Sequence, residues 1–142
     1  MAYPKGISLT CWPVGQGLFT QFDVYAGDAT FRVVYDCGSF TSGRGSPLDG
    51  AIRLLRDRPI DLLIISHFHY DHISGVPKLL DVVGLPRYAW VPHVHPQVCI
   101  LQVIAVIADA TLAGLSFPEY EQIALLAANP ADWLRERGKN EW

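Results

Sequence analysis

The sequence predicts an α/β (α+β) fold, with strands concentrated early in the chain and helices in its last third. Half of the 142 residues are hydrophobic, which is enough to build a core and excludes a disordered chain. Short apolar runs separated by glycine and proline occupy much of residues 1–95, a pattern typical of strands and turns. Longer apolar segments with fewer breaks follow residue 96 and favour helices.

Three strands are expected first, at residues 7–12, 18–25 and 30–35. Residues 26–29 read Ala-Gly-Asp-Ala, which is turn chemistry, so the second and third strands should form a hairpin. Their aromatic and β-branched side chains favour packing on a pleated sheet.

A helix and a core strand are expected next. Residues 46–49, Ser-Pro-Leu-Asp, combine a serine cap, a proline at the first helical position and a first-turn acid, and Pro59 should end this helix. Residues 60–65, Ile-Asp-Leu-Leu-Ile-Ile, have the composition and length of a buried strand. A short helix over residues 76–83, started by Ser74, should follow.

The remaining elements are an edge or parallel strand at residues 87–91 and several helices. Residues 98–117 are long and apolar enough to span a bilayer, but polar residues interrupt them and no basic flank orients them. We therefore predict a buried helix, broken near Gly114. A helix should open at residues 118–121, and a last one, residues 133–137, should stop at Gly138.

The most informative stretch is residues 66–72, Ser-His-Phe-His-Tyr-Asp-His. It holds three of the five histidines, follows the predicted core strand and precedes Gly75, which permits a sharp turn. These side chains should therefore lie at the C-terminal end of a core strand, where open α/β sheets bind their ligands. A surface histidine cluster or a helical arrangement is the alternative.

The spacing of this stretch suits metal ions. In extended backbone, residues two apart point the same way, so His67 and His69 can offer imidazole nitrogens to one cation. The following turn can bring Asp71 and His72 toward a second cation. Imidazole and carboxylate ligands together suit zinc, with iron, manganese or cobalt as alternatives.

This motif resembles the His-x-His-x-Asp-His signature of the metallo-β-lactamase-fold hydrolases. Residues 14–17, Val-Gly-Gln-Gly, resemble the family's glycine loop, and residues 33–38 resemble its strand ending in Asp-x-Gly. The resemblance covers about residues 7–90 and implies two αββα halves with two metal ions between them. Residues 1–95 would then form the N-terminal half of an αββα sandwich, and residues 96–142 a helical extension that ends before the second half.

The resemblance also implies roles for individual residues. His67 and His69 would hold the first metal, and Asp71 and His72 the second. Asp71 would also be the catalytic proton acceptor. Asp36 would lie under the metal loop and orient it by hydrogen bonds, the alternative being a turn aspartate bonded to its own backbone.

The site in this sequence departs from the family pattern. The family adds a later histidine to each metal and a bridging aspartate, whereas no histidine follows His95. We interpret His93 and His95, which lie between prolines, as rim or packing residues, with metal ligation as the alternative. Leu18 stands where many members have an aspartate. These departures would be explained if the sequence is a truncated product, one piece of a split enzyme or a degenerate domain. Metal binding by this chain alone should be weak.

The leading functional interpretation is a two-zinc hydrolase acting on a phosphodiester in a small-molecule or nucleotide-type substrate. The glycine loop resembles that of the branch containing DNA-uptake competence proteins and related phosphodiesterases. The alternatives are a non-catalytic metal-binding or interaction module, and a thioester or glyoxalase-type hydrolase.

The composition of the chain limits which partners and which cellular location are expected. The net charge of −3 argues against strong nucleic-acid binding. The three cysteines lack metal-like spacing, so we expect them to be reduced thiols. The N-terminus has no apolar signal core. A cytoplasmic protein without membrane attachment is therefore expected. Half of a sandwich would leave an apolar face uncovered, so we expect a second half-domain or self-association to cover it.

Overall fold

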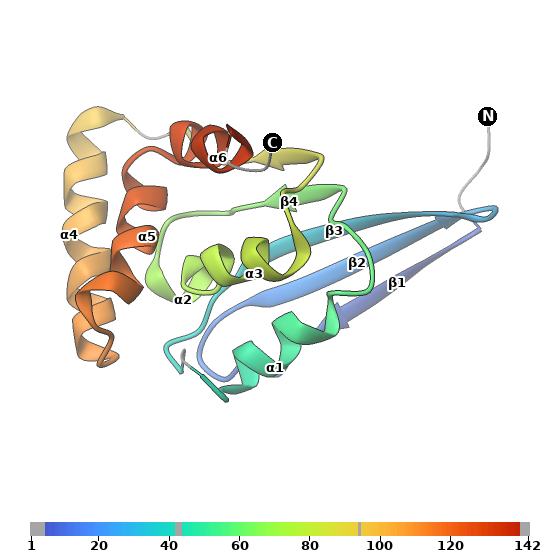
Figure 1. The fold of residues 1–142 in the computed structure, drawn as a ribbon, viewed down its shortest axis with the longest axis horizontal. Helices are drawn as coiled ribbons and strands as arrows, with labels where there is room; N and C mark the ends of the chain where they lie inside the picture. Colours follow the sequence, from blue (N-terminus) through green and yellow to red (C-terminus); the bar gives the residue numbers. More distant parts are fainter. Residues whose placement is uncertain (1–4, 42–43, 94, 140–142) are drawn as a thin grey trace.

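The computed structural model describes residues 5–41, 44–93 and 95–139. A five-stranded mixed sheet, in the order β1-β2-β3-β4-β5, forms the centre, and α1 and α3 lie against one of its faces (Figure 1). The strands are β1 Gly6–Cys11, β2 Phe19–Ala26, β3 Ala29–Cys37, β4 Leu62–Ile64 and β5 Tyr88–Trp90. The helices are α1 Pro47–Leu54, α2 Tyr70–Ile73, α3 Val76–Val83, α4 Pro96–Leu112, α5 Phe117–Ala128 and α6 Pro130–Lys139.

The predicted α/β class and the predicted strands are confirmed. β1, β2 and β3 form an antiparallel meander, and the β2–β3 hairpin closes where Ala26 pairs with Ala29. β4 is parallel to both β3 and β5, so the carboxyl ends of β3, β4 and β5 meet at one edge of the sheet. The motif follows β4 at this edge.

The helix starts are partly as predicted. Ser46 caps α1, and its Oγ accepts a hydrogen bond from the Asp49 N–H at 3.2 Å. The prediction that Ser74 starts α3 is wrong. Gly75 is the N-cap of α3, whereas Ser74 ends α2. The Ser74 hydroxyl instead bonds the backbone of Ser39, at 2.9 Å to its N–H and 3.0 Å to its carbonyl oxygen.

The prediction that Gly138 stops the last helix is also wrong. α6 runs through Gly138 to Lys139. A Cβ at Gly138 would lie 3.3 Å from a methyl group of Leu85, so the glycine serves close packing rather than helix termination.

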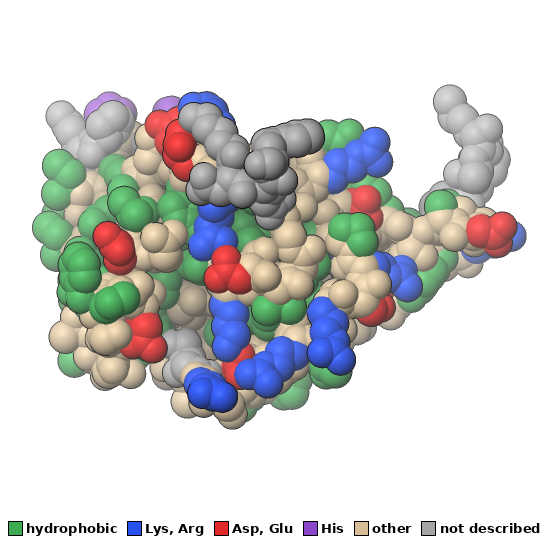
Figure 2. All heavy atoms as spheres, viewed as in Figure 1, with side chains coloured by type: hydrophobic (Ala, Val, Ile, Leu, Met, Phe, Trp, Pro, Cys, Tyr) green, Lys and Arg blue, Asp and Glu red, His purple; other side chains and the backbone are tan. Residues whose placement is uncertain are grey.

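The long apolar helix is only partly buried, which corrects the sequence prediction: Val106 and Ala110 lie in the core, and much of the rest is exposed. α4 lies on the surface against α5, and Ile100, Leu101 and Leu112 are 64%, 67% and 85% exposed. The helix is apolar on every side, so its pattern could not indicate how much of it would be covered. The break at Gly114 is confirmed by its φ of 78°. Figure 2 shows hydrophobic side chains over α4 and α5, and Lys and Arg side chains over α1 and α3.

The described residues contain no helix that is both long and apolar enough to cross a membrane. Cys11, Cys37 and Cys99 are all free thiols.

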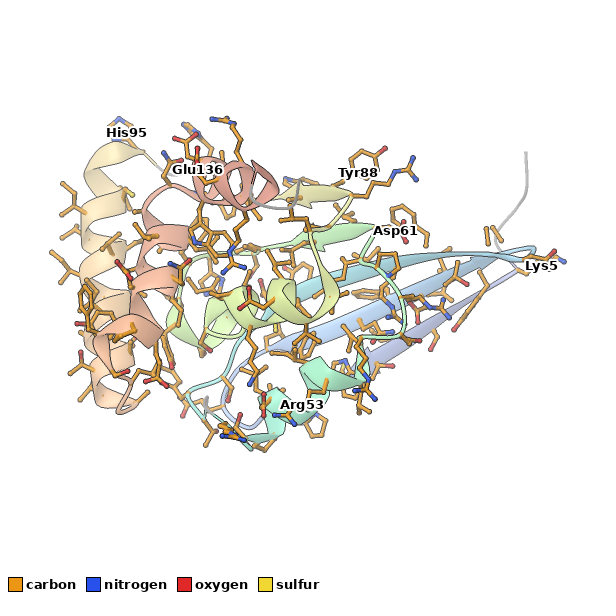
Figure 3. All side chains as sticks on the ribbon, viewed as in Figure 1. Lys5, Arg53, Asp61, Tyr88, His95 and Glu136 are labelled. Carbon is orange, nitrogen blue, oxygen red and sulfur yellow. The ribbon has the colours of Figure 1, made fainter. Side chains whose placement is uncertain are left out.

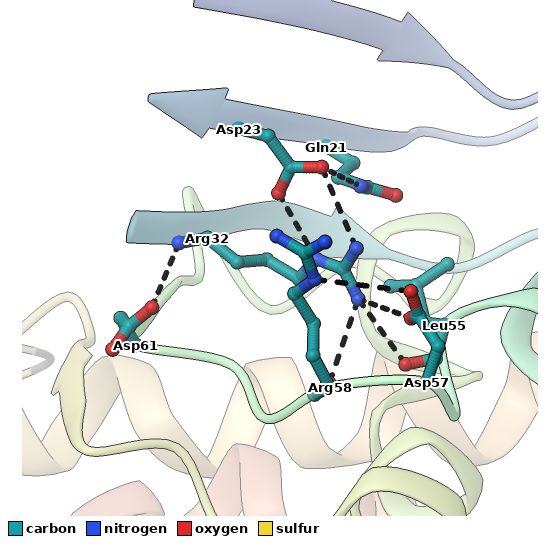
Figure 4. A network of polar contacts seen from close by, with 7 residues as sticks. All are labelled: Gln21, Asp23, Arg32, Leu55, Asp57, Arg58 and Asp61. Atoms are coloured by element: carbon teal, nitrogen blue, oxygen red, sulfur yellow. Dashed lines mark hydrogen bonds and ion pairs between the residues drawn. The ribbon is translucent and has the colours of Figure 1, made fainter. Parts of the chain in front are cut away.

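A buried arginine ties the hairpin to α1 (Figure 4). Arg32 on β3 is 4% exposed, and its guanidinium lies 3.0 Å from an oxygen of Asp23 on β2 and 2.9 Å from one of Asp57. It also donates to the carbonyl oxygen of Leu55 at 3.2 Å, just after α1. The N–H of Arg32 donates to Asp61, which precedes β4, at 2.8 Å. These contacts hold α1 and the start of β4 in place on the sheet.

Candidate metal centre

The motif lies at the C-terminal end of β4, in extended backbone that gives way to α2. His69 has φ −76° and ψ 147°, and α2 begins directly after it. The ring centroid of His67 lies 4.5 Å from that of His69 and 4.0 Å from that of His72. Nε2 of His72 lies 3.8 Å from Oδ2 of Asp71. The structure therefore brings together all four residues that the sequence indicated as metal ligands.

Asp36 lies directly beneath the motif at the end of β3. It is fully buried, and its φ of 53° is in the left-handed region, which aspartate tolerates better than most residues. Its Oδ1 accepts a hydrogen bond from the Ser66 N–H at 2.7 Å, and its Oδ2 accepts one from the Ser66 hydroxyl at 2.6 Å. Nδ1 of His72 lies 2.8 Å from the same Oδ2. A strained backbone at a buried carboxylate is typical of a functional position.

The hydrogen bonds around Asp36 assign the protons on two histidine rings. A carboxylate only accepts, so Nδ1 of His72 carries a proton, and in the neutral ring Nε2 then keeps its lone pair. Because the Ser66 hydroxyl donates to Asp36, it accepts from Nδ1 of His67, which lies 2.8 Å away. In their neutral forms both rings would therefore carry the proton on Nδ1 and leave Nε2 free to bind a cation. Ser66 is the residue whose role the sequence analysis missed. The available signal was a hydroxyl between the core strand and the first histidine.

The neutral form of His67 is also favoured by its surroundings. Burial lowers the pKa of His67 from its ordinary value, and the nearby His72 and His69 lower it further. Asp36 and Asp71 offset part of this effect. A neutral imidazole can donate its lone pair to a cation without first losing a proton.

Close backbone contacts hold the far end of the motif. The N–H of Leu18, which follows the glycine loop, donates to the carbonyl oxygen of Asp71 at 3.1 Å. A Cβ at Gly17 would lie 2.8 Å from the same oxygen, and one at Gly38 would lie 2.5 Å from the carbonyl carbon of Asp71. The Gly75 N–H donates to the carbonyl oxygen of Cys37 at 2.9 Å. The glycines are required because the backbones approach too closely for a side chain.

His93 and His95 are both exposed and follow β5. His95 lies at the start of α4, where its carbonyl oxygen accepts hydrogen bonds from the N–H groups of Val98 and Cys99 (Figure 3). The assignment of His93 and His95 as rim residues stays a prediction.

Two hollows lie near these elements. A shallow one of about 320 Å³ is lined by Ser66 together with Tyr35, Ile64 and Trp90, and so borders the motif on the open face of the sheet. A larger one of about 450 Å³ lies between α1, α3 and α5. Its described lining includes none of the four motif side chains, so size alone does not mark the chemical site.

With this geometry established, comparison with known proteins identifies the family. Residues 21–96, more than half of the chain, match the metallo-beta-lactamase superfamily. The chain belongs to this superfamily. Its mixed sheet followed by helices is consistent with part of the metallo-β-lactamase fold.

A similar protein is Ribonuclease Z of Agathobacter rectalis, which is 40% identical over 53 residues. The match covers 37% of this chain and 16% of that protein. The chain thus covers about one sixth of the length of this relative.

Members of the metallo-β-lactamase superfamily usually bind metal ions, and the residue types in the motif, though not their arrangement in this structure, suit such an ion. Imidazole nitrogens, as on His67 and His72, and a carboxylate, as on Asp71, are the donors that zinc and similar cations take. Ligand atoms about 2.0–2.1 Å from a tetrahedral zinc lie roughly 3.4 Å apart, and the 3.8 Å between Asp71 and His72 is close to this. Within the described residues, however, no three His, Cys, Asp or Glu side chains form a group that could hold a metal.

Proposed function

We propose that this chain carries the metal-binding residues of a metal-dependent hydrolase whose substrate is a phosphodiester. The observation that carries the proposal is the hydrogen-bonded system of Asp36, Ser66, His67 and His72, which orients two imidazole nitrogens from beneath the loop. Membership of the superfamily supports hydrolysis. The similarity to a protein named Ribonuclease Z supports a phosphodiester, the bond that joins nucleotides in RNA.

His67 and His69 would hold one cation, and Asp71 and His72 a second. Zinc is the proposed metal, with manganese or iron as alternatives. When bound, such cations lower the pKa of water and stabilise the negative charge that develops on a phosphodiester during attack.

The residues of the chain supply orientation and proton transfer. Asp36 and Ser66 accept from Nδ1 of the two rings, which fixes the ring orientations and leaves Nε2 as the ligand atom of each neutral imidazole. Asp71 is partly exposed, at 23% of its side chain, so its carboxylate can reach a water molecule and accept a proton from it. Asp71 is therefore the proposed general base.

The charge of the chain favours a small or nucleotide-type substrate over a long nucleic acid. At a net charge of −3, the chain has no strong positive field to hold a polyphosphate backbone. Recognition would instead depend on the reacting phosphate and on the hollow beside Ser66, whose lining is mostly apolar.

The experiment is an assay of bis(p-nitrophenyl) phosphate hydrolysis by the 142-residue chain with added zinc or manganese. We expect slow hydrolysis above the background of free metal. The His69→Ala variant should lose it. The His93→Ala variant, an exposed histidine outside the motif, is the matched control and should retain it.

The outcome that contradicts the proposal is equal activity of the chain and its His69→Ala variant. A chromogenic cephalosporin and a thioester, assayed in parallel, test the bond type. Hydrolysis of either one in preference to the phosphodiester would keep the metal site but overturn the proposed substrate.

A further inference from the structure

A second candidate site lies on the helix side of the sheet. We call the hollow of about 450 Å³ between α1, α3 and α5 the helix-side hollow; Arg137 of α6 also lines it. Its volume is within the range of about 300–1,000 Å³ that is typical of small-molecule sites. Its described lining includes none of the four motif side chains, so it is separate from the candidate metal centre.

The floor of the helix-side hollow is apolar. Leu48 and Ile52 of α1 and Ile123 of α5 belong to the lining, and each is at most 2% exposed. Such a floor binds the apolar body of a ligand, because contact removes both surfaces from water.

Basic side chains surround this floor. Arg44, Lys78 and Arg137 line the hollow from three different parts of the chain, and Lys and Arg side chains gather over α1 and α3 (Figure 2). Arg44 is exposed and takes no part in the ion pairs that Lys78 and Arg137 form. Nε of Arg137 is buried and has no hydrogen-bond partner among the described residues. A buried donor of this kind needs a partner such as a ligand or a water molecule.

Two of the acidic side chains in the lining are neutralised within the chain. The buried carboxylate of Asp49 forms ion pairs with both Lys78 and Arg53, so this group of three carries one net positive charge. Asp81 pairs with Arg137 at 2.7 Å. Neither carboxylate therefore presents an unpaired negative charge to a ligand.

Glu119 is the remaining acid in the lining. Its carboxylate accepts hydrogen bonds from the N–H and the hydroxyl of Ser116, both at 2.7 Å. With Glu119 included, four basic and three acidic side chains in and next to the lining leave one positive charge, in a chain whose net charge is −3. The helix-side hollow is thus a positive region of a negative chain.

Three helices begin at the helix-side hollow. Ser46 and Gly75, the N-caps of α1 and α3, line it, and so does Pro118 in the first turn of α5. The N-terminus of a helix carries about half a positive charge and free N–H groups, which favour anions. Gly75 has no capping side chain, so the first N–H groups of α3 keep their capacity to bind a ligand.

We infer that the helix-side hollow binds a small organic phosphate, with the phosphate at the basic side chains and helix N-termini and the apolar body on the floor. A phosphate suits this site better than a carboxylate, because the donors come from several elements and three terminal oxygens can accept from them at once. The inference does not depend on the proposed hydrolase activity.

The test is a titration of phenyl phosphate into the isotope-labelled 142-residue chain, followed by amide NMR without added metal. We expect saturable shifts of the N–H signals of Ser46, Gly75 and Lys78, with a Kd on the order of 1 mM for a ligand of this size. No saturable shift up to about 10 mM would overturn the inference. So would shifts confined to residues outside the lining. Either failure would leave the metal-site proposal intact, because no metal is present in this experiment.

Arg44→Glu tests the basic side chains. Arg44 is exposed, so this variant should fold normally, and its Kd should rise at least about tenfold because an attractive charge becomes a repulsive one. Arg56→Glu is the matched control, since Arg56 is also exposed but follows α1 outside the lining. Its Kd should change less than about twofold. An unchanged Kd in Arg44→Glu, or equal weakening in both variants, would overturn the inference.

Two further probes test the two parts of the ligand. Inorganic phosphate lacks the apolar body, and benzoate keeps a ring but carries a carboxylate, so both should bind several-fold more weakly than phenyl phosphate. Inorganic phosphate that binds as tightly would show that the floor has no part in recognition. Benzoate that binds as tightly would show that the site does not select a phosphate. Either result would contradict the inference.

Discussion

Nδ1 of His72 lies 2.8 Å from Oδ2 of Asp36, across 36 residues of sequence. This contact joins the end of β3 to α2, and through Ser66 the same carboxylate also orients the ring of His67. Such supporting contacts determine both the tautomer and the direction of a ligand histidine.

The first prediction concerns Asp36→Asn. The amide keeps the shape of the carboxylate but presents an N–H₂ group to donors, so at least one buried hydrogen bond is lost. We expect a loss of about 1–3 kcal/mol in the free energy of unfolding and a 10–100-fold loss of metal affinity. Urea unfolding and cobalt titration measure the two effects. Asp28→Asn, at the exposed hairpin tip, is the control and should change neither. Unchanged metal affinity in Asp36→Asn would show that the carboxylate has no orienting role.

The second prediction concerns Gly38→Ala. The new Cβ would lie 2.5 Å from a backbone carbon of Asp71 and of the same order from His72, too close for atoms of the main chain to accommodate without movement. Overpacking of this kind typically costs about 1–3 kcal/mol. Gly50→Ala is the matched control, since Gly50 lies in α1 with nothing within 4 Å of its added Cβ, and it should stabilise the chain by up to about 1 kcal/mol. Equal stability of the two variants in urea would contradict the close packing described for the motif.

The third prediction concerns the buried arginine. Arg32→Met leaves Asp23, which is 7% exposed, without its charged partner, so the free energy of unfolding should fall by about 3–5 kcal/mol. Asp57 is 57% exposed in its side chain, and Asp57→Asn should cost less than about 1 kcal/mol. Removing both charges in Arg32→Met with Asp23→Leu should recover part of the loss. A double variant less stable than Arg32→Met alone would mean that the pair is not the source of the effect.

The fourth prediction concerns pH. Hydrogen bonding by Lys78, followed by the N–H of Gly45, lowers the pKa of the buried Asp49 below its ordinary value of 3.8. A carboxyl whose pKa is lower in the folded chain than in the unfolded chain stabilises the folded state. This contribution is complete above the unfolded-state pKa and is lost as the pH falls through the folded-state pKa. Asp49→Asn should therefore be less stable than the parent chain by about 1–2 kcal/mol at pH 7, and the difference should shrink in urea unfolding at pH 3. A difference that is the same at both pH values would contradict this account.

The sequence predicted those features that depend on local chemistry. The hairpin at residues 26–29 and the Ser46 cap follow from turn and cap residues, and the position of the motif follows from the apolar run before it. Features that depend on tertiary packing were missed or misassigned. Ser74 is a residue type that often caps helices, but its hydroxyl forms hydrogen bonds with the backbone of Ser39 instead.

The degree of burial was the least predictable quantity. α4 is apolar on every side, so periodicity could not show that Leu101 or Leu112 would remain exposed. The role of Ser66 was also missed, because its hydroxyl bonds a carboxylate that lies 30 residues away in the sequence.

The central claim is that the motif binds a divalent metal, and the most direct measurement is a cobalt titration of the 142-residue chain followed by visible absorption. We predict saturable but weak binding, because the four ligands divide between two ions and neither ion gains the three protein ligands of a catalytic zinc site. His69→Ala should weaken binding at least about tenfold, and His93→Ala should not change it. Binding of the same strength in the parent chain and in His69→Ala would contradict the claim.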